Sequence, residues 1–329
     1  MMSLFAALLH GVYRISGAKK AFALPEEKLL REVEKQNRHR GFFMPTDHKA
    51  YYEKRVINGF PCLIVREKPE PAPRAILCFF GGGMVIGPDK GAAAVLRKLC
   101  YETGCDVWFP CYPLCTEHCI TESYDMVFEC YQQMTELYGG GNVSTCGFSS
   151  GAALALGIAS HNNALGQPLP QPRHIVAVSP GEVPWNDEER ARMRALNNSD
   201  VSVDYAGLET LGKIMWCDDD AIKPYFIAAA KALTLGNLRR QLMDSLEDKP
   251  FPPLPEELQR HTFFEFGSAE DHYKYRAAVM AAYPKGNFPV FEGYNHMQYQ
   301  IRDPRGFAEM LVAVMEQDTL PVLPFFESE

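Results

Sequence analysis

Three polar residues in this sequence, Ser149, Glu270 and His296, are of the types that together carry out nucleophilic catalysis. A serine hydroxyl is a weak nucleophile at neutral pH, so it needs a neighbouring base that takes its proton. Histidine can serve as that base, and a carboxylate then fixes the tautomer of the imidazole and stabilises the imidazolium that forms. The three residues therefore define a candidate site for acyl transfer to a serine.

Ser149 is the central residue of a Gly-x-Ser-x-Gly motif at residues 147–151. The apolar run before it, residues 143–148, is typical of a buried strand, and the alanine-rich run after it, residues 152–159, is typical of a helix. The serine would then lie on a sharp strand-to-helix turn, where side chains at Gly147 and Gly151 would crowd the strained backbone. The alternative is an ordinary glycine-flanked turn, because short motifs also match by chance.

A triple glycine, residues 81–83, follows directly after the apolar run 74–80, which is too short for a typical helix and is typical of a buried strand. One interpretation is a flexible loop. The other is an anion site, because glycines let backbone N–H groups point at a ligand oxygen with no side chain in the way, as a tetrahedral oxyanion requires.

His296 lies in a loop just after the last predicted strand, residues 288–291. Sheet folds place catalytic groups in loops at this edge of the sheet. The sequence has nine histidines, and His118 is the other serious candidate for the base. The alternative is that His296 has a structural role only, as a hydrogen-bonded histidine in the core or at the surface.

Glu270 follows the predicted strand 262–266 and would lie at the same edge of the sheet. Asp271 is its immediate neighbour, and the sequence leaves open which of the two side chains points at the imidazole. The distance from Gly267 favours Glu270. The chain order of serine, acid and histidine is that of the α/β-hydrolase arrangement.

Strands and helices alternate around these residues, which predicts an α/β fold with a mainly parallel central sheet and helices on both of its faces. Residues 1–50 contain apolar residues at helical spacing and are predicted to form N-terminal helices outside the sheet. Residues 51–184 and 256–329 are predicted to form the core. Between them, residues 185–255 lose the strand pattern and are predicted to form a helical cap over Ser149.

The sequence resembles the hormone-sensitive-lipase-like branch of the α/β-hydrolases, the carboxylesterases of the alpha/beta hydrolase fold-3 type. Residues 79–87 are similar to the His-Gly-Gly-Gly stretch of that family, and residues 112–118 are similar to its Tyr-Arg-Leu-Ala-Pro-Glu-His stretch. With Ser149, Glu270 and His296 the likeness extends over residues 55–315. The second stretch departs from the family pattern at three positions, Pro113, Cys115 and Thr116.

The resemblance implies an oxyanion hole formed by the N–H groups of Gly82, Gly83 and Ser150, with the early helices and the 185–255 insertion as the cap. It also implies that His118 is structural. Phe80 stands where the family has histidine, so the glycine loop must be braced in another way.

The composition is that of an ordinary water-soluble protein, with 47% hydrophobic and 22% charged residues among 329. A net charge of −8 without a basic block excludes a nucleic-acid surface. The absence of a convincing secretory signal or an apolar run of about 18 residues, and ten cysteines placed mostly in apolar runs, predict a cytoplasmic protein without disulfides.

No cofactor is expected. Cys111, Cys115, His118 and Cys119 have side chains that suit soft metals. Their spacing matches no zinc pattern, so we expect no metal.

The predicted function is hydrolysis of short- to medium-chain carboxylic esters through an acyl-enzyme on Ser149. Two alternatives remain at this level: an amide or formamide hydrolase with the same residues, and a ligand-binding module on a hydrolase fold that has lost its chemistry. The partner is a small-molecule ester, and a homodimer is left open.

Overall fold

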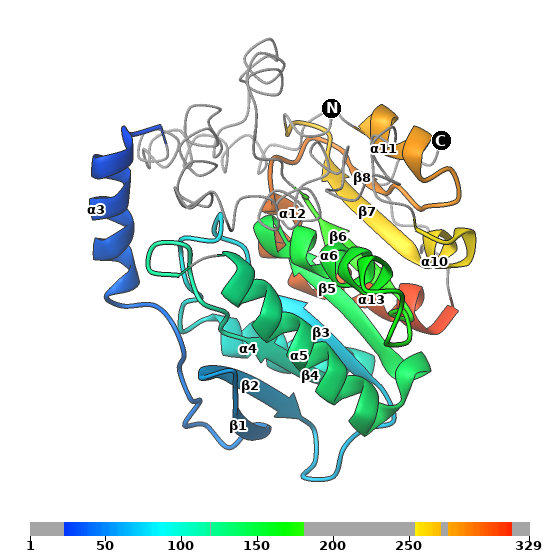
Figure 1. Cartoon of the computed structure of the whole chain (residues 1–329), viewed down its shortest axis with the longest axis horizontal. Coiled ribbons are helices and arrows are strands. Elements are labelled where there is room, and N and C mark those ends of the chain that lie inside the picture. The colour runs from blue at the N-terminus through cyan, green and yellow to red at the C-terminus, as the bar shows by residue number, and fades with distance from the viewer. Residues whose placement is uncertain (1–22, 119, 181–253, 271–275, 318–329) are drawn as a thin grey trace.

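The computed structural model describes residues 23–118, 120–180, 254–270 and 276–317, which are organised around an eight-stranded sheet (Figure 1). The strand order is β1-β2-β4-β3-β5-β6-β7-β8. β1 pairs antiparallel with β2 and β2 antiparallel with β4, whereas every other neighbouring pair is parallel. The strands are β1 (Tyr51–Ile57), β2 (Phe60–Arg66), β3 (Ala75–Phe79), β4 (Asp106–Pro110), β5 (Val143–Phe148), β6 (Ile175–Val178), β7 (Thr262–Gly267) and β8 (Val290–Phe291).

The central strands form because their sequences are continuous apolar runs that suit burial on both faces of a parallel sheet. All residues of β3, β4, β6 and β7 are buried, whereas in the edge strand β1 every residue except Ile57 is exposed or half-buried. β5 lies between β3 and β6, in the middle of the sheet. The strand that leads to Ser149 is therefore held by neighbours on both sides.

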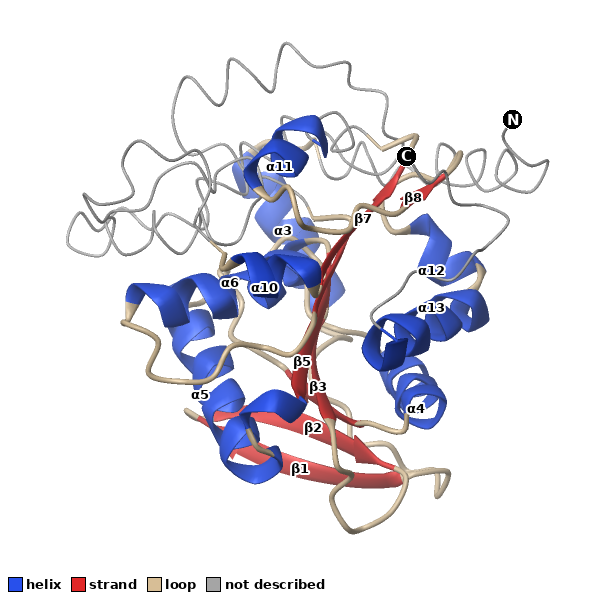
Figure 2. Cartoon of the chain, turned by 90° about the vertical axis from the view of Figure 1, so that its right-hand side faces the viewer, coloured by secondary structure: helices blue, strands red, loops and turns tan. Residues whose placement is uncertain are grey.

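Helices cover both faces of the sheet, as Figure 2 shows in a view along its edge. On one side lie α4, α12 and α13, and on the other lie α5, α6 and α10. The helices are α3 (Glu26–Asn37), α4 (Ala92–Thr103), α5 (Ile120–Tyr138), α6 (Ser150–Ala164), α10 (Glu256–Arg260), α11 (Arg276–Ala282), α12 (Gln298–Arg302) and α13 (Pro304–Gln317), with a 3-10 turn at Gly140–Asn142. No helix in this described part is long and apolar enough to cross a membrane.

The predicted α/β architecture with a mainly parallel sheet is confirmed. The predicted boundaries between core and cap stay a prediction, because residues 1–22 and 181–253 lie outside the described residues. Of the early helices, α3 is described, and its buried residues Leu29 and Val33 join the hydrophobic core.

Candidate active site

Ser149 lies between β5 and α6 in a backbone conformation that few residues other than glycine adopt. Its φ is +53° and its ψ is −121°. Such a conformation costs on the order of 1–3 kcal/mol and persists only where the surrounding structure imposes it. Here the amide of Ser149 donates to the carbonyl of Val178 on β6 at 2.9 Å, and its carbonyl accepts from the amide of Ala152 in the first turn of α6. The strained turn predicted from the motif is confirmed.

Gly147 and Gly151 have the steric role that the motif predicts. A Cβ atom at Gly147 would collide with the backbone of Gly151, and one at Gly151 would collide with the carbonyl oxygens of Phe79 and Phe80. α6 therefore crosses β5 and the end of β3 with backbone touching backbone. No rotamer change can relieve a collision with backbone, so both positions need glycine.

The structure brings Ser149, His296 and Glu270 together in one hydrogen-bonded chain. Nε2 of His296 lies 2.8 Å from Oγ of Ser149, and Nδ1 of the same ring lies 3.0 Å from Oε2 of Glu270. The side chain of His296 is 9% exposed and that of Glu270 is fully buried. Distances of this length would allow proton transfer from a serine hydroxyl to an imidazole that a carboxylate orients.

Glu270 is anchored by the backbone just before it. Its Oε1 accepts from the amide of Gly267 at 2.7 Å, while its own amide donates to the carbonyl of Gly267 at 3.1 Å. One carboxylate oxygen is thus fixed by β7, which leaves Oε2 aimed at His296. The alternative acid, Asp271, lies outside the described residues.

The loop that carries His296 is tied down by two side chains that the sequence analysis did not single out. The amide of Asn295 donates to Oε1 of Gln298 at 3.0 Å, and the amide of Met297 donates to Oγ of Ser179 at 3.0 Å. Ser179 directly follows β6, the strand next to the one that leads to Ser149. The only sequence signal for this role was its position directly after a buried strand.

The glycine loop passes directly beside Ser149. A Cβ atom at Gly81 would lie 3.0 Å from Cβ of Ser149 and 2.8 Å from the carbonyl oxygen of Phe148. Gly82 and Gly83 have φ values of +127° and +62°, in the region that favours glycine. The carbonyl of Gly82 accepts from the amides of Val85 and Ile86, which closes the loop into a tight turn.

α3 holds the far end of this loop through Asn37. Its Nδ2 donates to the carbonyl of Val85 at 2.8 Å, and its Oδ1 accepts from the amide of Gly87 at 3.1 Å. On the opposite side of the serine, the amide of Ser150 begins α6, where backbone N–H groups have no partner within the helix and attract negative charge. The surroundings of Ser149 thus include amides from two different elements.

Phe80 braces the glycine loop with its ring rather than with a polar group. The ring stacks on Tyr112 with centroids 4.1 Å apart and planes 2° apart. The hydroxyl of Tyr112 donates to the carbonyl of Phe80 at 2.8 Å. The stacked pair therefore fixes the backbone at the start of the loop, which answers how this chain manages without the family histidine at position 80.

His118, the other candidate base, has different partners. Its Nδ1 lies 3.1 Å from Oε2 of Glu122, and its ring meets that of Phe60 edge-on with centroids 5.1 Å apart. Of the cysteines near it, Cys111 has a thiol whose pKa is raised by burial to about 12, and Cys119 lies outside the described residues. In the part of the chain that the structure describes, no group of three or more His, Cys, Asp and Glu side chains could hold a metal ion.

A second buried carboxyl, Glu265 on β7, lies behind the histidine loop. Its side chain is 1% exposed, and its Oε2 is 3.4 Å from Nε2 of Gln300. Burial raises the pKa of this carboxyl from 4.5 to about 8, so the group holds a proton at neutral pH. The backbone carbonyl of Glu265 accepts from the amide of Ser179, and the hydroxyl of Ser179 accepts from the amide of Met297.

This raised pKa predicts a pH dependence of stability. A carboxyl whose pKa is higher in the folded state stabilises the fold fully below its unfolded pKa and loses that contribution as the pH rises through the folded value. Glutamine has nearly the shape of a protonated glutamate but does not titrate. The free energy of unfolding of Glu265→Gln minus that of the native protein should therefore rise between pH 4.5 and about 8. We expect a rise of more than about 1.4 kcal/mol, equivalent to one pKa unit.

Urea unfolding at several pH values measures this difference. Glu70→Gln makes the same substitution at an exposed position and serves as the matched control. If the free energies of unfolding of the native protein and of Glu265→Gln changed in parallel with pH, the raised pKa of Glu265 would be contradicted.

Residues 76–261 match the model of a protein family described as "alpha/beta hydrolase fold". No curated protein matches the chain. Among solved structures, an esterase/lipase from an uncultured bacterium is 18% identical, with 96% of this chain and 98% of that chain covered and a TM-score of 0.66.

Two further solved structures are similar over almost the whole chain. An esterase from the bacterial hormone-sensitive lipase family is 18% identical, with 97% of this chain and 100% of that chain covered and a TM-score of 0.65. An esterase from the archaeon Pyrobaculum calidifontis is 15% identical, with 95% and 98% covered and a TM-score of 0.65. At this level of identity the similarity concerns the fold.

Proposed function

The chain belongs to the alpha/beta hydrolase fold family, and from this premise we propose that it is a serine hydrolase that cleaves carboxylic esters through an acyl-enzyme intermediate. The observation that carries the proposal is the hydrogen-bonded chain from Oγ of Ser149 through the ring of His296 to Glu270, with distances of 2.8 and 3.0 Å. The resemblance noted in the sequence is confirmed at the level of the family.

In the first half of the reaction, Oγ of Ser149 attacks the ester carbonyl carbon while Nε2 of His296 takes the hydroxyl proton. The carbonyl π electrons move onto oxygen, and the amides of Gly82, Gly83 and Ser150 stabilise the oxyanion. As the carbonyl re-forms, the bond to the alkoxy oxygen breaks. His296 returns its proton to that oxygen, so the alcohol leaves neutral and the acyl group stays on Ser149.

Water completes the cycle by the same route. His296 takes a proton from water as the water oxygen attacks the acyl carbon, and the same amides hold the second oxyanion. When this intermediate collapses, the bond to Oγ breaks and His296 returns the proton to Ser149. Glu270 orients the ring and stabilises the imidazolium in both halves without taking the proton itself.

The comparisons support an ester as substrate, since the similar structures are called esterases. They leave open the acyl length and the choice between ester and amide, because both bonds pass through the same oxyanion. A binding module on this fold would need neither a base within reach of the serine nor an orienting carboxylate. The contacts of His296 therefore favour the enzyme.

Labelling with a fluorophosphonate probe tests the proposal. Such probes react with a serine only where a base activates it, so intact mass should show one adduct on the native protein and none on Ser149→Ala. A native protein that stays unmodified would indicate a binding module. For a labelled protein, rates on an aryl ester and on the anilide of the same acid then separate an esterase from an amidase.

A further inference from the structure

Two consecutive residues at the end of β6 hold the segments that carry the nucleophile and the base. The carbonyl of Val178 accepts from the amide of Ser149 at 2.9 Å. The hydroxyl of Ser179 accepts from the amide of Met297, the residue after His296, at 3.0 Å. Because the two contacts share one strand end, the backbones at the serine and at the histidine are fixed relative to the same point of the sheet.

Ser179 and Met297 both have a backbone conformation that is unfavourable for residues other than glycine. Their φ values are +46° and +57°. Pro180 makes the first of these more unusual, because a residue before proline prefers extended backbone. Six non-glycine residues have a positive φ in the described part of the chain, and Ser149, Ser179 and Met297 are three of them. Such strain persists only where the surrounding structure imposes it, and it gathers at functional sites.

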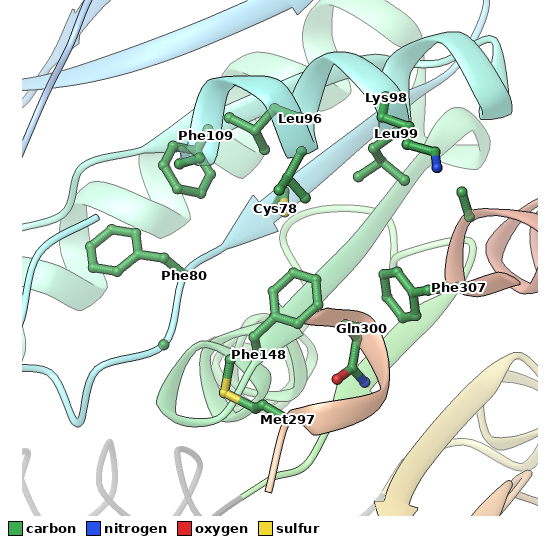
Figure 3. Close-up of a pocket in the computed structure, with 14 residues that line it drawn as sticks. Cys78, Phe80, Leu96, Lys98, Leu99, Phe109, Phe148, Met297, Gln300 and Phe307 are labelled. Atoms are coloured by element: carbon green, nitrogen blue, oxygen red, sulfur yellow. The ribbon is translucent and has the colours of Figure 1, made fainter. Parts of the chain in front are cut away.

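Met297 is held on its backbone and on its side chain. The residue that accepts from its amide, Ser179, is 3% exposed, and the amide of Ser179 donates to the carbonyl of Glu265 on β7 at 2.9 Å. The side chains of Met297 and Phe148 line one apolar cavity of about 390 Å³ (Figure 3). Met297 is also the N-cap of α12. The base is therefore followed by a residue whose position is set by the sheet.

We propose that Ser179 is a positioning residue for the base, an inference that rests on the proposed function. Ser179 takes no part in the bond changes. Its hydroxyl fixes the amide next to His296, which keeps Nε2 of that ring 2.8 Å from Oγ of Ser149. A displacement of about 1 Å at a reacting group can cost about a hundredfold in rate. We therefore expect loss of the hydroxyl to lower kcat by about 10- to 100-fold.

Two variants separate the hydroxyl of Ser179 from the strain of its backbone. Ser179→Ala loses the hydroxyl and keeps the strain, whereas Ser179→Gly loses the hydroxyl and relieves the strain, because glycine adopts a positive φ without steric cost. If the hydroxyl positions the base, both variants should lose kcat on a short-chain aryl ester to a similar extent. Thermal unfolding should nevertheless occur at a higher temperature in Ser179→Gly than in Ser179→Ala. A purely structural role would instead make kcat follow stability.

Gln167→Gly is the matched control for the relief of strain. Gln167 is exposed, has a φ of +59° and lies beyond the end of α6 that is opposite to Ser149. This variant should keep the native kcat.

The rate of labelling by a fluorophosphonate probe gives a second readout, because it reports the reactivity of Ser149 without turnover. This rate should fall in Ser179→Ala and Ser179→Gly together with kcat. Native rates in both variants, or native rates in Ser179→Gly alone, would overturn the positioning role and leave the proposed function standing. A native protein that is not labelled at all would instead overturn the proposed function.

Discussion

Ser149→Ala is expected to lower kcat for a carboxylic ester by about 10⁵- to 10⁶-fold, because it removes the only atom that can form the acyl-enzyme. Losses of this size follow when the nucleophile of a serine hydrolase is removed. A residual rate above that of water should remain, since the amides around the site still stabilise an oxyanion. The backbone strain at position 149 is unchanged in this variant, because alanine at a φ of +53° is strained as serine is.

Initial rates and the burst of chromogenic alcohol from a short-chain aryl ester measure this loss. Ser144→Ala is the matched control, because Ser144 lies on the same strand with its hydroxyl 3.3 Å from Nδ1 of His174, away from the candidate site. We expect the control to keep the native burst. A full burst from Ser149→Ala would eliminate Ser149 as the nucleophile.

Glu270→Gln is expected to lower kcat by about 10⁴-fold with little change in fold. An amide cannot stabilise the imidazolium, and it favours the wrong tautomer of the histidine, which is the effect known for the equivalent acid of serine proteases. The buried Oε1 position can still accept from the amide of Gly267, so the loop keeps this anchor. The loss should thus appear in kcat and in the pH profile of kcat/KM rather than in stability.

Asp271→Asn is the natural comparison, since the two acids are neighbours in the sequence. If Glu270 orients the ring, Asp271→Asn should retain activity within about threefold, because this variant keeps the carboxylate that stabilises the imidazolium. The reverse result, a large loss at Asp271 with full activity at Glu270→Gln, would transfer the role to Asp271. Equal small losses at both positions would mean that His296 works without a carboxylate.

The sequence was sufficient for the sheet and for the turn at Ser149. Buried parallel strands appear as unbroken apolar runs, so β3 and β5 were recognisable without any structure. Gly147 and Gly151 were informative because local sterics leave no other residue for those places, as the collisions of a Cβ atom with neighbouring backbone show. Local rules of this kind need no knowledge of distant contacts.

The partners of Phe80 illustrate what those rules miss. Nothing in residues 79–87 indicates that the ring stacks on Tyr112, because the pair is formed only when β3 and the segment after β4 meet. The hydroxyl of Tyr112 then fixes the carbonyl of Phe80. The sequence also did not indicate that the side chains of Ser179 and Gln298 accept hydrogen bonds from the backbone amides of the loop that carries His296.

The residue types, their chain order and the fold class could thus be obtained from the amino-acid sequence, because they depend on short-range sterics and on hydrophobic periodicity. The 2.8 Å contact between His296 and Ser149, the aim of Glu270 and the cavity beneath Phe148 were decided by tertiary structure. Each of them depends on the packing of segments that lie more than 20 residues apart in the sequence. The hydrophobic periodicity of one segment carries no information about its distance from another segment in the folded chain.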